Sequence, residues 1–285
     1  MATELIKAIR KKISRLPIKY LIFSHFHTDH ILGAGAFLKE NPCITIIAHQ
    51  KTAEHIGAYT MNEQKSWGDE IKRKSIDARN QAILTKSEEN KNYLLKAADE
   101  FDAYYRDIKT SVIVPPNLTF TDSLGLYDKY FNIQLRWLGA GHTPGDIVVI
   151  VPQDKVLITG DLVHDFEPLF WDADPDSWIQ VLEKIKQIDF DYFIRGHGDM
   201  HEGKDIVYAW QNYIKELKTK TLIAIKNNLT LKSFQDEITL ESFTSLQNGY
   251  GERIQKFRTS YMEFLPGPIL DAVKDEIAYV WKFYN

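Results

Sequence analysis

Short apolar runs separated by helix-periodic segments recur along this chain. Runs of strand length lie at 19–24, 43–48 and 190–195. Apolar runs of this length that alternate with helical periodicity are typical of α/β proteins with a buried sheet. The pattern therefore predicts an α/β fold.

Helix boundaries can be placed between these runs. Thr3 can cap a first helix that Pro17 would end. The apolar face of that helix consists of Leu5, Ile6, Ile9 and Ile13. A second helix is predicted from about Ile31 to Glu40, and a later one begins near Asp174-Pro175, because proline suits the first helical position.

Two longer segments, 51–110 and 205–285, favour helices throughout. The first is polar, with eleven acidic and eleven basic side chains, but apolar residues such as Leu94, Ala98 and Phe101 recur in it at helical spacing. We predict a helical insertion over 51–110 and a C-terminal helical region over 205–285. Whether the insertion is a solvated cap or a lid that shapes the substrate site stays open at this point.

The composition favours a soluble protein that acts on small molecules. The 285 residues are 44% hydrophobic, which is enough for a large core, and the net charge of -4 provides no polycationic surface for nucleic acid. No apolar run approaches the roughly eighteen residues of a membrane-spanning helix. We therefore expect a small-molecule substrate, and neither a nucleic-acid nor a membrane partner.

The single cysteine excludes one class of cross-link. Cys43 has no partner for an intramolecular disulfide. It lies inside the apolar run 43–48, which predicts a small buried side chain. No cysteine occupies any of the candidate metal positions identified next.

Three imidazoles and a carboxylate fall within six residues, directly after the first apolar run. They are His25, His27, Asp29 and His30. A strand that ends there would bring all four to one edge of a sheet. Zinc accepts neutral imidazole nitrogen and carboxylate oxygen, and four ligands at this spacing exceed what one catalytic ion with an open position needs. The block therefore predicts two metal ions.

Three further candidates follow later apolar runs, and each is preceded by glycine. They are His142 after Gly141, Asp161 after Gly160, and His197 after Gly196. Glycine suits a sharp exit from a strand, where the backbone comes close to a metal.

The ordered set resembles the HxHxDH … His … Asp … His pattern of the metallo-β-lactamase superfamily. The resemblance implies a four-layer αββα sandwich over 1–204, with 51–110 inserted in it. It assigns His25, His27 and His142 to a first metal, Asp29, His30 and His197 to a second, and Asp161 to both as a bridge. A shared carboxylate lowers the repulsion between two neighbouring cations, which supports this assignment on physical grounds.

The resemblance also implies an activity. The expected protein is a hydrolase with two Zn²⁺ per chain, in which a metal-bridging hydroxide attacks an ester, thioester, lactone or lactam carbonyl. Asp161 and Asp29 would serve catalysis as metal ligands, with Asp29 not acting as a free base. The Thr159-Gly160-Asp161 context is closest to glyoxalase II-like, lactonase-like and β-lactamase-like general hydrolases.

Two other functional classes stay open. An iron-dependent persulfide dioxygenase shares much of the ligand set, and an inactive metal-binding fragment would keep the motifs without turnover. Metal content distinguishes iron-dependent oxidation from hydrolysis, and turnover of a chromogenic lactam or ester distinguishes either from an inactive scaffold. The nuclease and phosphodiesterase branches of the superfamily are less favoured, because no basic surface that would hold a polyanion is evident.

The lead before the first motif is short for this family. Members usually carry several strands before HxHxDH, whereas twenty-four residues precede His25 here. We therefore expect part of the N-terminal strand layer to be lacking. An exposed sheet edge is normally paired or covered, so a homo-oligomer that covers it is also expected.

The remaining polar residues near the motifs carry weaker signals. His164 stands three residues after Asp161 and is a candidate for contacting the substrate or supporting the metal ligands. His49, His55 and His201 are expected to be ordinary surface or core histidines. Asp146 and Asp199 follow glycines, which is more often turn chemistry than catalysis.

Overall fold

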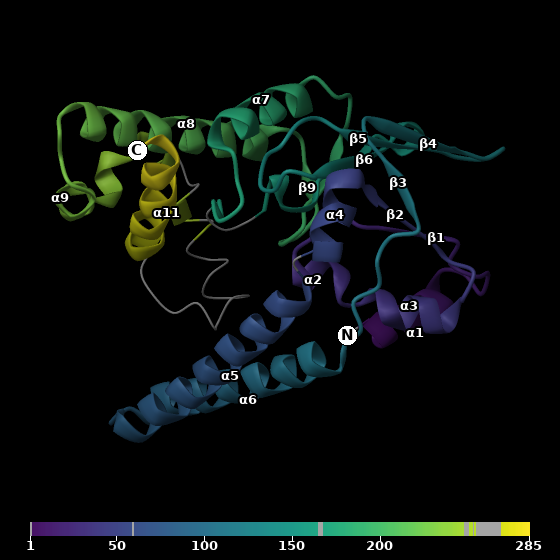
Figure 1. The fold of residues 1–285 in the computed structure, drawn as a ribbon, viewed down its shortest axis with the longest axis horizontal. Coiled ribbons are helices and arrows are strands. Elements are labelled where there is room, and N and C mark those ends of the chain that lie inside the picture. The colour runs from purple at the N-terminus through teal and green to yellow at the C-terminus, as the bar shows by residue number, and fades with distance from the viewer. Residues whose placement is uncertain (1, 59, 165–167, 248–250, 253, 255–268) are drawn as a thin grey trace. The chain divides into compact units, whose positions relative to one another are not determined.

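The computed structural model shows a mixed α/β protein (Figure 1). It describes residues 2–58, 60–164, 168–247, 251–252, 254 and 269–285. The chain forms two compact units, here called unit 1 (Met1–Ala48 with Thr52–Thr119) and unit 2 (His49–Lys51 with Phe120–Asn285). The predicted α/β class is confirmed.

Unit 1 contains most of a three-stranded sheet in the order β1-β2-β3. Its strands are β1 (Tyr20–Ile22), β2 (Thr45–His49) and β3 (Leu118–Phe120). The described helices along this part of the chain are α1 (Ala2–Lys12), α2 (Thr28–Ile31), α3 (Ala34–Glu40), α4 (Gln50–Ala58), α5 (Thr60–Leu84) and α6 (Glu88–Thr110).

The parallel pair β1 and β2 determines where the first motif leaves the sheet. Ile22 lies opposite Ile47, and the connection between the strands passes through α2 and α3 as a parallel pair requires. The Phe23 amide still donates to the Ile47 carbonyl (2.9 Å), so the chain stays on the sheet just past β1. Phe23 and Phe26 are buried in the apolar core of unit 1. His25 therefore lies at the carboxyl end of β1.

Three sequence predictions for unit 1 need correction. The helix predicted over 31–40 is two helices, α2 and α3, and α2 begins three residues earlier than predicted, within the motif. Thr3 is not a cap, because α1 already includes Ala2, and α1 ends at Lys12, well before Pro17. On the predicted apolar face, Leu5 and Ile13 are exposed.

Cys43 is exposed, so the prediction of a buried side chain was wrong. The strand β2 begins at Thr45, two residues later than the apolar run suggests. Cys43 instead lies in the turn before β2, where its amide donates to Oδ1 of Asn41 (3.1 Å). Turn residues lie at the surface, because their backbone groups need water or local partners.

The predicted helical insertion is present, and its long helices α5 and α6 lie side by side (Figure 1). Ser87 caps α6 by accepting a hydrogen bond from the Asn90 amide. The seam between the helices is apolar, and its buried residues include Ile71, Ala78, Ala82, Ala97, Ala98 and Phe101. Asp102 accepts hydrogen bonds from Lys72 (2.9 Å), Ser75 (2.8 Å) and Arg79 (2.8 Å), all on α5. This polar network ties α6 to α5.

Unit 2 contains a six-stranded sheet in the order β4-β5-β6-β7-β8-β9. The strands are β4 (Ser123–Tyr127), β5 (Asn132–Trp137), β6 (Ile147–Val151), β7 (Val156–Ile158), β8 (Tyr192–Ile194) and β9 (His201–Glu202). Neighbouring strands are antiparallel except β7 and β8, which are parallel and are joined through α7 (Pro175–Lys186). As predicted, α7 starts at Asp174-Pro175, with Asp174 accepting from the amides of Asp176 and Ser177.

Within its described residues, the C-terminal region is largely helical, as predicted, and residues 248–250, 253 and 255–268 lie outside the description. Its main helices are α8 (Asp205–Lys226), α9 (Leu231–Glu237) and α11 (Ile269–Tyr284). Trp178 of α7 and Trp210 of α8 are fully buried in the core of unit 2, with ring centroids 6.3 Å apart. Among the helices that the structure describes, none is long and apolar enough to cross a membrane.

Candidate metal centre

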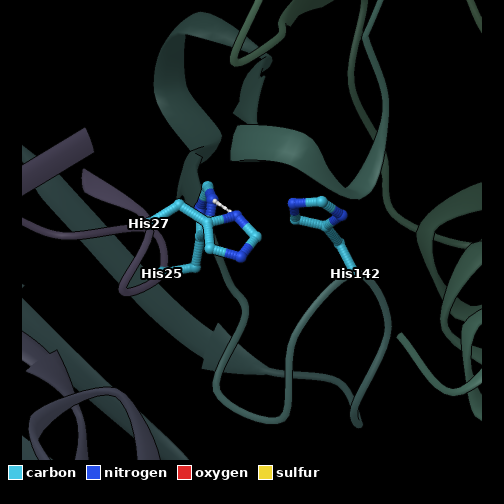
Figure 2. A group of neighbouring side chains, drawn as sticks. All are labelled: His25, His27 and His142. Carbon is cyan, nitrogen blue, oxygen red and sulfur yellow. Dashed lines mark hydrogen bonds between the residues drawn. The ribbon is translucent and has the colours of Figure 1, made fainter. Parts of the chain in front are cut away.

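The first two predicted ligands lie together at the end of β1. His25 is completely buried, and its Nδ1 is 3.1 Å from the Ser24 hydroxyl oxygen. That contact leaves Nε2, which lies 3.1 Å from Nδ1 of His27 (Figure 2). His27 precedes α2 with an extended backbone (φ -60°, ψ 146°). The local chain therefore presents one nitrogen from each ring to a common point.

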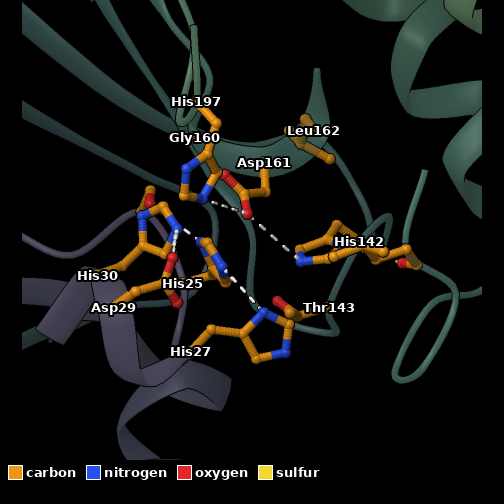
Figure 3. Close-up of polar contacts among 12 residues, drawn as sticks. His25, His27, Asp29, His30, His142, Thr143, Gly160, Asp161, Leu162 and His197 are labelled. Atoms are coloured by element: carbon orange, nitrogen blue, oxygen red, sulfur yellow. Dashed lines mark hydrogen bonds and ion pairs between the residues drawn. The ribbon is translucent and has the colours of Figure 1, made fainter. Parts of the chain in front are cut away.

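Asp29 and His30 lie in the short helix α2. Oδ2 of Asp29 is 3.1 Å from Nε2 of His30 (Figure 3). The ring centroids of His25 and His30 are 4.1 Å apart, so His30 also adjoins the first pair. Unit 1 thus gathers the four donors that the sequence places in the HxHxDH block.

Phe26, which lies between the first two ligands in sequence, packs into the apolar core and not toward the ligands. Phe26 is 2% exposed and belongs to the core of unit 1. Its ring stacks on His55 of α4, with centroids 4.7 Å apart and planes at 10°. His55 therefore packs against the motif through the Phe26 ring. The sequence did not indicate this contact.

In unit 2, parallel pairing aligns two of the remaining candidates. Ile158 of β7 lies opposite Ile194 of β8, and Asp161 and His197 each follow three residues later. The segments that follow β7 and β8 stay hydrogen-bonded to each other, because the Gly196 amide donates to the Gly160 carbonyl (3.0 Å). The two side chains consequently emerge at one edge of the sheet.

Asp161 lies between two imidazoles of unit 2. Its Oδ2 is 3.8 Å from Nε2 of His142 and 3.5 Å from Nε2 of His197 (Figure 3). The carboxylate residue is 3% exposed and His142 is 1% exposed. A buried carboxylate between two ring nitrogens is the arrangement expected of a shared ligand.

His142 is oriented by a backbone group distant in sequence. Its Nδ1 lies 3.0 Å from the Leu169 carbonyl, which can only accept, so Nδ1 carries the proton. The lone pair is then on Nε2, the atom nearest Asp161. Histidines that bind metals usually donate their other N–H to such a carbonyl.

The donor separations within each unit suit a metal ion. They are 3.1 Å for His25 and His27, 3.1 Å for Asp29 and His30, and 3.5 to 3.8 Å around Asp161. Ligands placed tetrahedrally about 2.0 Å from zinc lie about 3.3 Å from one another. Both the spacing and the donor chemistry of the two sets therefore fit zinc.

Three glycines beside these ligands leave little tolerance for a side chain. A Cβ on Gly196 would lie 1.8 Å from Oδ1 of Asp161. A Cβ on Gly141 would lie 2.4 Å from Cδ2 of Leu162. Gly160 also adopts a positive φ of 53°, which side chains rarely tolerate. The glycines that flank the motifs are there for close backbone approach, as the sequence suggested.

Asp146 stabilises the turn that carries His142. Its carboxylate accepts from the Thr143 amide (2.7 Å) and the Thr143 hydroxyl (2.8 Å). This is the turn role that the sequence favoured for Asp146. For Asp199, the backbone carbonyl accepts a hydrogen bond from Nε of Arg195 (3.1 Å).

His164 lies among the ligands of unit 2. Its ring centroid is 6.3 Å from that of His142, 6.2 Å from that of His197 and 4.5 Å from that of Trp210. Its side chain is fully buried, with the Trp210 ring edge-on against it.

His49 and His201 contact residues outside the predicted ligand set. His49 stacks on Trp137, and its Nε2 lies 2.9 Å from the Thr121 carbonyl. His201 pairs with Asp205. Neither contact involves a predicted ligand.

Besides His55, two contributors to the site were missed from the sequence. The Leu169 carbonyl has no sequence signal, because any residue supplies a carbonyl and this one is 27 positions from His142. Tyr104 of α6 hydrogen-bonds Thr28, inside the HxHxDH block. A tyrosine in a polar helix gives no hint of such a contact.

Comparison with known proteins gives a family match and curated relatives. Residues 1–197 match the family model described as the metallo-beta-lactamase superfamily. The linear primary-alkylsulfatase of Pseudomonas sp. is 24% identical over 276 residues, which cover 90% of this chain and 50% of that protein. The metallo-beta-lactamase type 2 of Bacteroides fragilis is 33% identical over 90 residues, which cover 30% of this chain and 36% of that protein.

A solved structure shares the fold along nearly the whole chain. The stereoselective inverting sec-alkylsulfatase Pisa1 from Pseudomonas sp. superposes with a TM-score of 0.61 at 15% identity, covering 98% of this chain and 43% of that chain. The chain thus spans half or less of the length of these relatives.

Proposed function

The chain belongs to the metallo-β-lactamase superfamily, and from that membership we propose that it is a zinc-dependent hydrolase of an ester, thioester, lactone or lactam. The curated relatives are named as hydrolases of a sulfate ester and of a β-lactam. Since the chain spans half or less of each relative, their substrates serve here only to define the range to be tested.

The proposed ligands are the seven side chains that the family pattern specifies. His25, His27 and His142 would hold one zinc ion, Asp29, His30 and His197 a second, and Asp161 would be shared. The donor spacing within each unit supports this assignment. Asp29 serves as a ligand in this scheme and not as a free base.

The observation that carries the proposal is the position of Asp161. Its buried carboxylate lies 3.8 Å from His142 Nε2 and 3.5 Å from His197 Nε2, and its Oδ1 occupies the space beside Gly196 that a Cβ would fill. A buried negative charge is costly unless cations neutralise it. Two divalent cations repel each other, and a carboxylate between them lowers that repulsion.

The chain prepares the ligands before any metal arrives. The Leu169 carbonyl keeps the His142 lone pair on Nε2, and the Ser24 hydroxyl engages Nδ1 of His25. Holding ring orientation and tautomer in this way raises metal affinity, because less order has to be imposed on binding. We assign His164 the same supporting role, since its fully buried ring adjoins both His142 and His197.

Bound zinc would supply a water activated near neutral pH and a Lewis acid for the substrate oxygen. The protein then needs no serine or cysteine nucleophile. Its own task is to hold seven ligands in place and to exclude competing geometries.

A second substrate class is favoured by the extent of one match. The alkylsulfatase aligns with 90% of this chain, so the match must extend into the region after residue 204, whereas the β-lactamase aligns with 30%. Alkyl sulfate esters therefore belong in the substrate panel beside lactams, lactones and thioesters.

Metal analysis and turnover together test the proposal. Protein purified without chelator is expected to contain two zinc ions per chain and to hydrolyse at least one member of the panel. One iron and no zinc in repeated preparations would favour the persulfide dioxygenase alternative. Bound zinc without turnover of any panel member would favour an inactive metal-binding protein.

A further inference from the structure

The helical insertion contacts the turn of the candidate ligands through an aromatic pair of unit 1. The Trp67 indole N–H on α5 donates to the Tyr104 phenol oxygen on α6 (3.3 Å). The phenol in turn hydrogen-bonds the Thr28 side chain, and the charge of Asp29 acts on it. Thr28 stands between His27 and Asp29 in sequence, so a hydrogen-bonded path runs from both long helices to the turn that carries the candidate ligands.

We propose that Tyr104 is a positioning residue for the metal ligands, which fixes through Thr28 the turn that carries His27, Asp29 and His30. The inference rests on the proposed function, because these residues matter as ligands only if metal binds. It assigns to the insertion a role that neither a solvated cap nor a substrate lid describes: the insertion sets the metal affinity of the site.

The turn that Tyr104 reaches lacks strong local support. The helix α2 has only four residues, and its N-cap residue His27 makes no side-chain capping bond. Helices of that length are not stable alone, because nucleation costs more than one turn of hydrogen bonds returns. A tertiary contact at Thr28, the first residue of α2, therefore contributes directly to holding Asp29 and His30.

The packing of α6 on α5 restricts the movement of the Tyr104 phenol. On α6, Phe101 and Ile108 lie about one turn to either side of Tyr104, and both are buried. The Asp102 network fixes the adjacent turn to α5. Burial, with a smaller contribution from the Asp29 charge, raises the pKa of Tyr104 to about 12. The phenol consequently keeps its proton throughout the neutral range.

Removal of the phenol oxygen should affect zinc binding without removing a ligand. Trp67 and Thr28 would both lose a partner, and the turn would lose its anchor to α6. Loss of a group that orients metal ligands typically lowers metal affinity about 10- to 100-fold. We expect a fall of about tenfold for Tyr104→Phe, because Thr28 lies beside the ligands and is not itself one.

The neighbouring tyrosine provides a matched control. Tyr105 lies on the same helix near Gly68, with Lys72 and Lys109 over its ring. Tyr105→Phe makes the same chemical change away from Thr28. On the other side of the contact, Thr28→Val removes the hydroxyl with little change of shape, and Thr28→Ser restores it.

The experiment measures zinc affinity by chelator competition, the visible spectrum of the cobalt-substituted protein, and the unfolding temperature of the metal-free protein. Tyr104→Phe and Thr28→Val should each weaken zinc binding about tenfold and alter the cobalt spectrum, and the double variant should lose no more than either alone. Thr28→Ser and Tyr105→Phe should match the parent. A folded Tyr104→Phe or Thr28→Val protein with parental affinity and spectrum would overturn the inference.

The parent protein separates this outcome from failure of the proposed function. If the parent binds zinc and hydrolyses a substrate while Tyr104→Phe behaves identically, only the inference fails. If the parent binds no divalent metal, the proposed function fails and the inference fails with it.

Discussion

A side chain at position 196 would collide with Asp161: an ideal Cβ on Gly196 lies 1.8 Å from Oδ1 of Asp161 and 2.9 Å from the carbonyl carbon of Gly160. The second of these contacts is backbone, which cannot rotate away. The position of the proposed bridging carboxylate and the identity of residue 196 are therefore linked.

Gly196→Ala should consequently displace the Asp161 carboxylate and lower metal affinity by at least about tenfold. The measurement is metal content after dialysis against a weak chelator. Gly57→Ala is the matched control, because a Cβ there meets nothing within 4 Å. Full metal retention in the Gly196→Ala protein would show that this carboxylate is not a ligand.

Asp161→Asn should lower the occupancy of at least one metal site, because the amide lacks the charge that offsets repulsion between two cations. Elemental analysis of protein purified without chelator measures the effect. Unchanged metal content together with an unchanged rate would show that Asp161 does not bridge two ions.

His142→Ala and His197→Ala should each reduce turnover of the best substrate by about 100-fold or more, since a lost ligand costs at least as much as a lost supporting group. Steady-state rates at saturating zinc provide the test. His201→Ala, which removes a histidine paired with Asp205 outside the ligand set, should leave the rate near that of the parent. Parental activity in either ligand variant would rule out the two-metal mechanism.

Activity should disappear on treatment with chelator, return with added zinc, and rise with pH through the neutral range as the activated water loses its proton. No covalent acyl-enzyme should form, because no side chain acts as the nucleophile. Intact-protein mass spectrometry during turnover checks the last point. A substrate-derived mass adduct would contradict the mechanism.

The Asp102 network predicts a pH dependence of stability. Hydrogen bonds from Lys72, Arg79 and Ser75 lower the pKa of Asp102 well below its usual range. A carboxyl whose pKa is lower in the folded state stabilises the fold above its unfolded pKa of about 3.9 and loses that contribution as pH falls below it.

Asp102→Asn should therefore cost about 1 kcal/mol of unfolding free energy at neutral pH, a modest value because Lys72 and Arg79 are 44% and 41% exposed. Urea unfolding at pH 7 and at pH 3 tests this, with a smaller difference expected at the lower pH. Asp99→Asn is the control, since that side chain is 74% exposed and contacts only Arg79 among the ion pairs of the described residues.

The family and its α/β fold class could be predicted from sequence, and both are confirmed. The reason is visible at Asp161 and His197: each follows the last residue of its strand by three positions, and parallel pairing of β7 with β8 brings both to one edge. Hydrophobic runs and glycines encode that arrangement locally. The assignment of ligands to two metals and the expected homo-oligomer stay predictions.

The sequence predictions that were wrong or missing concern features that local patterns do not encode. The start of α2 at Thr28 was missed because a four-residue helix without a side-chain cap has no local signal. Cys43 was misplaced because an apolar run does not say where the backbone leaves the sheet. The partners of His142 and Thr28, a carbonyl and a phenol, are brought near by tertiary folding alone.

The pairing of α5 with α6 has a thermal consequence. Two long helices that pack chiefly on each other can open as a local cooperative unit, at a lower free energy than the sheet beside them. Opening would release Tyr104 from Thr28 while β1 and β2 remain paired. Zinc affinity should then fall about tenfold on warming before the protein melts, as expected for Tyr104→Phe, and amide exchange in α6 should quicken over the same temperature range.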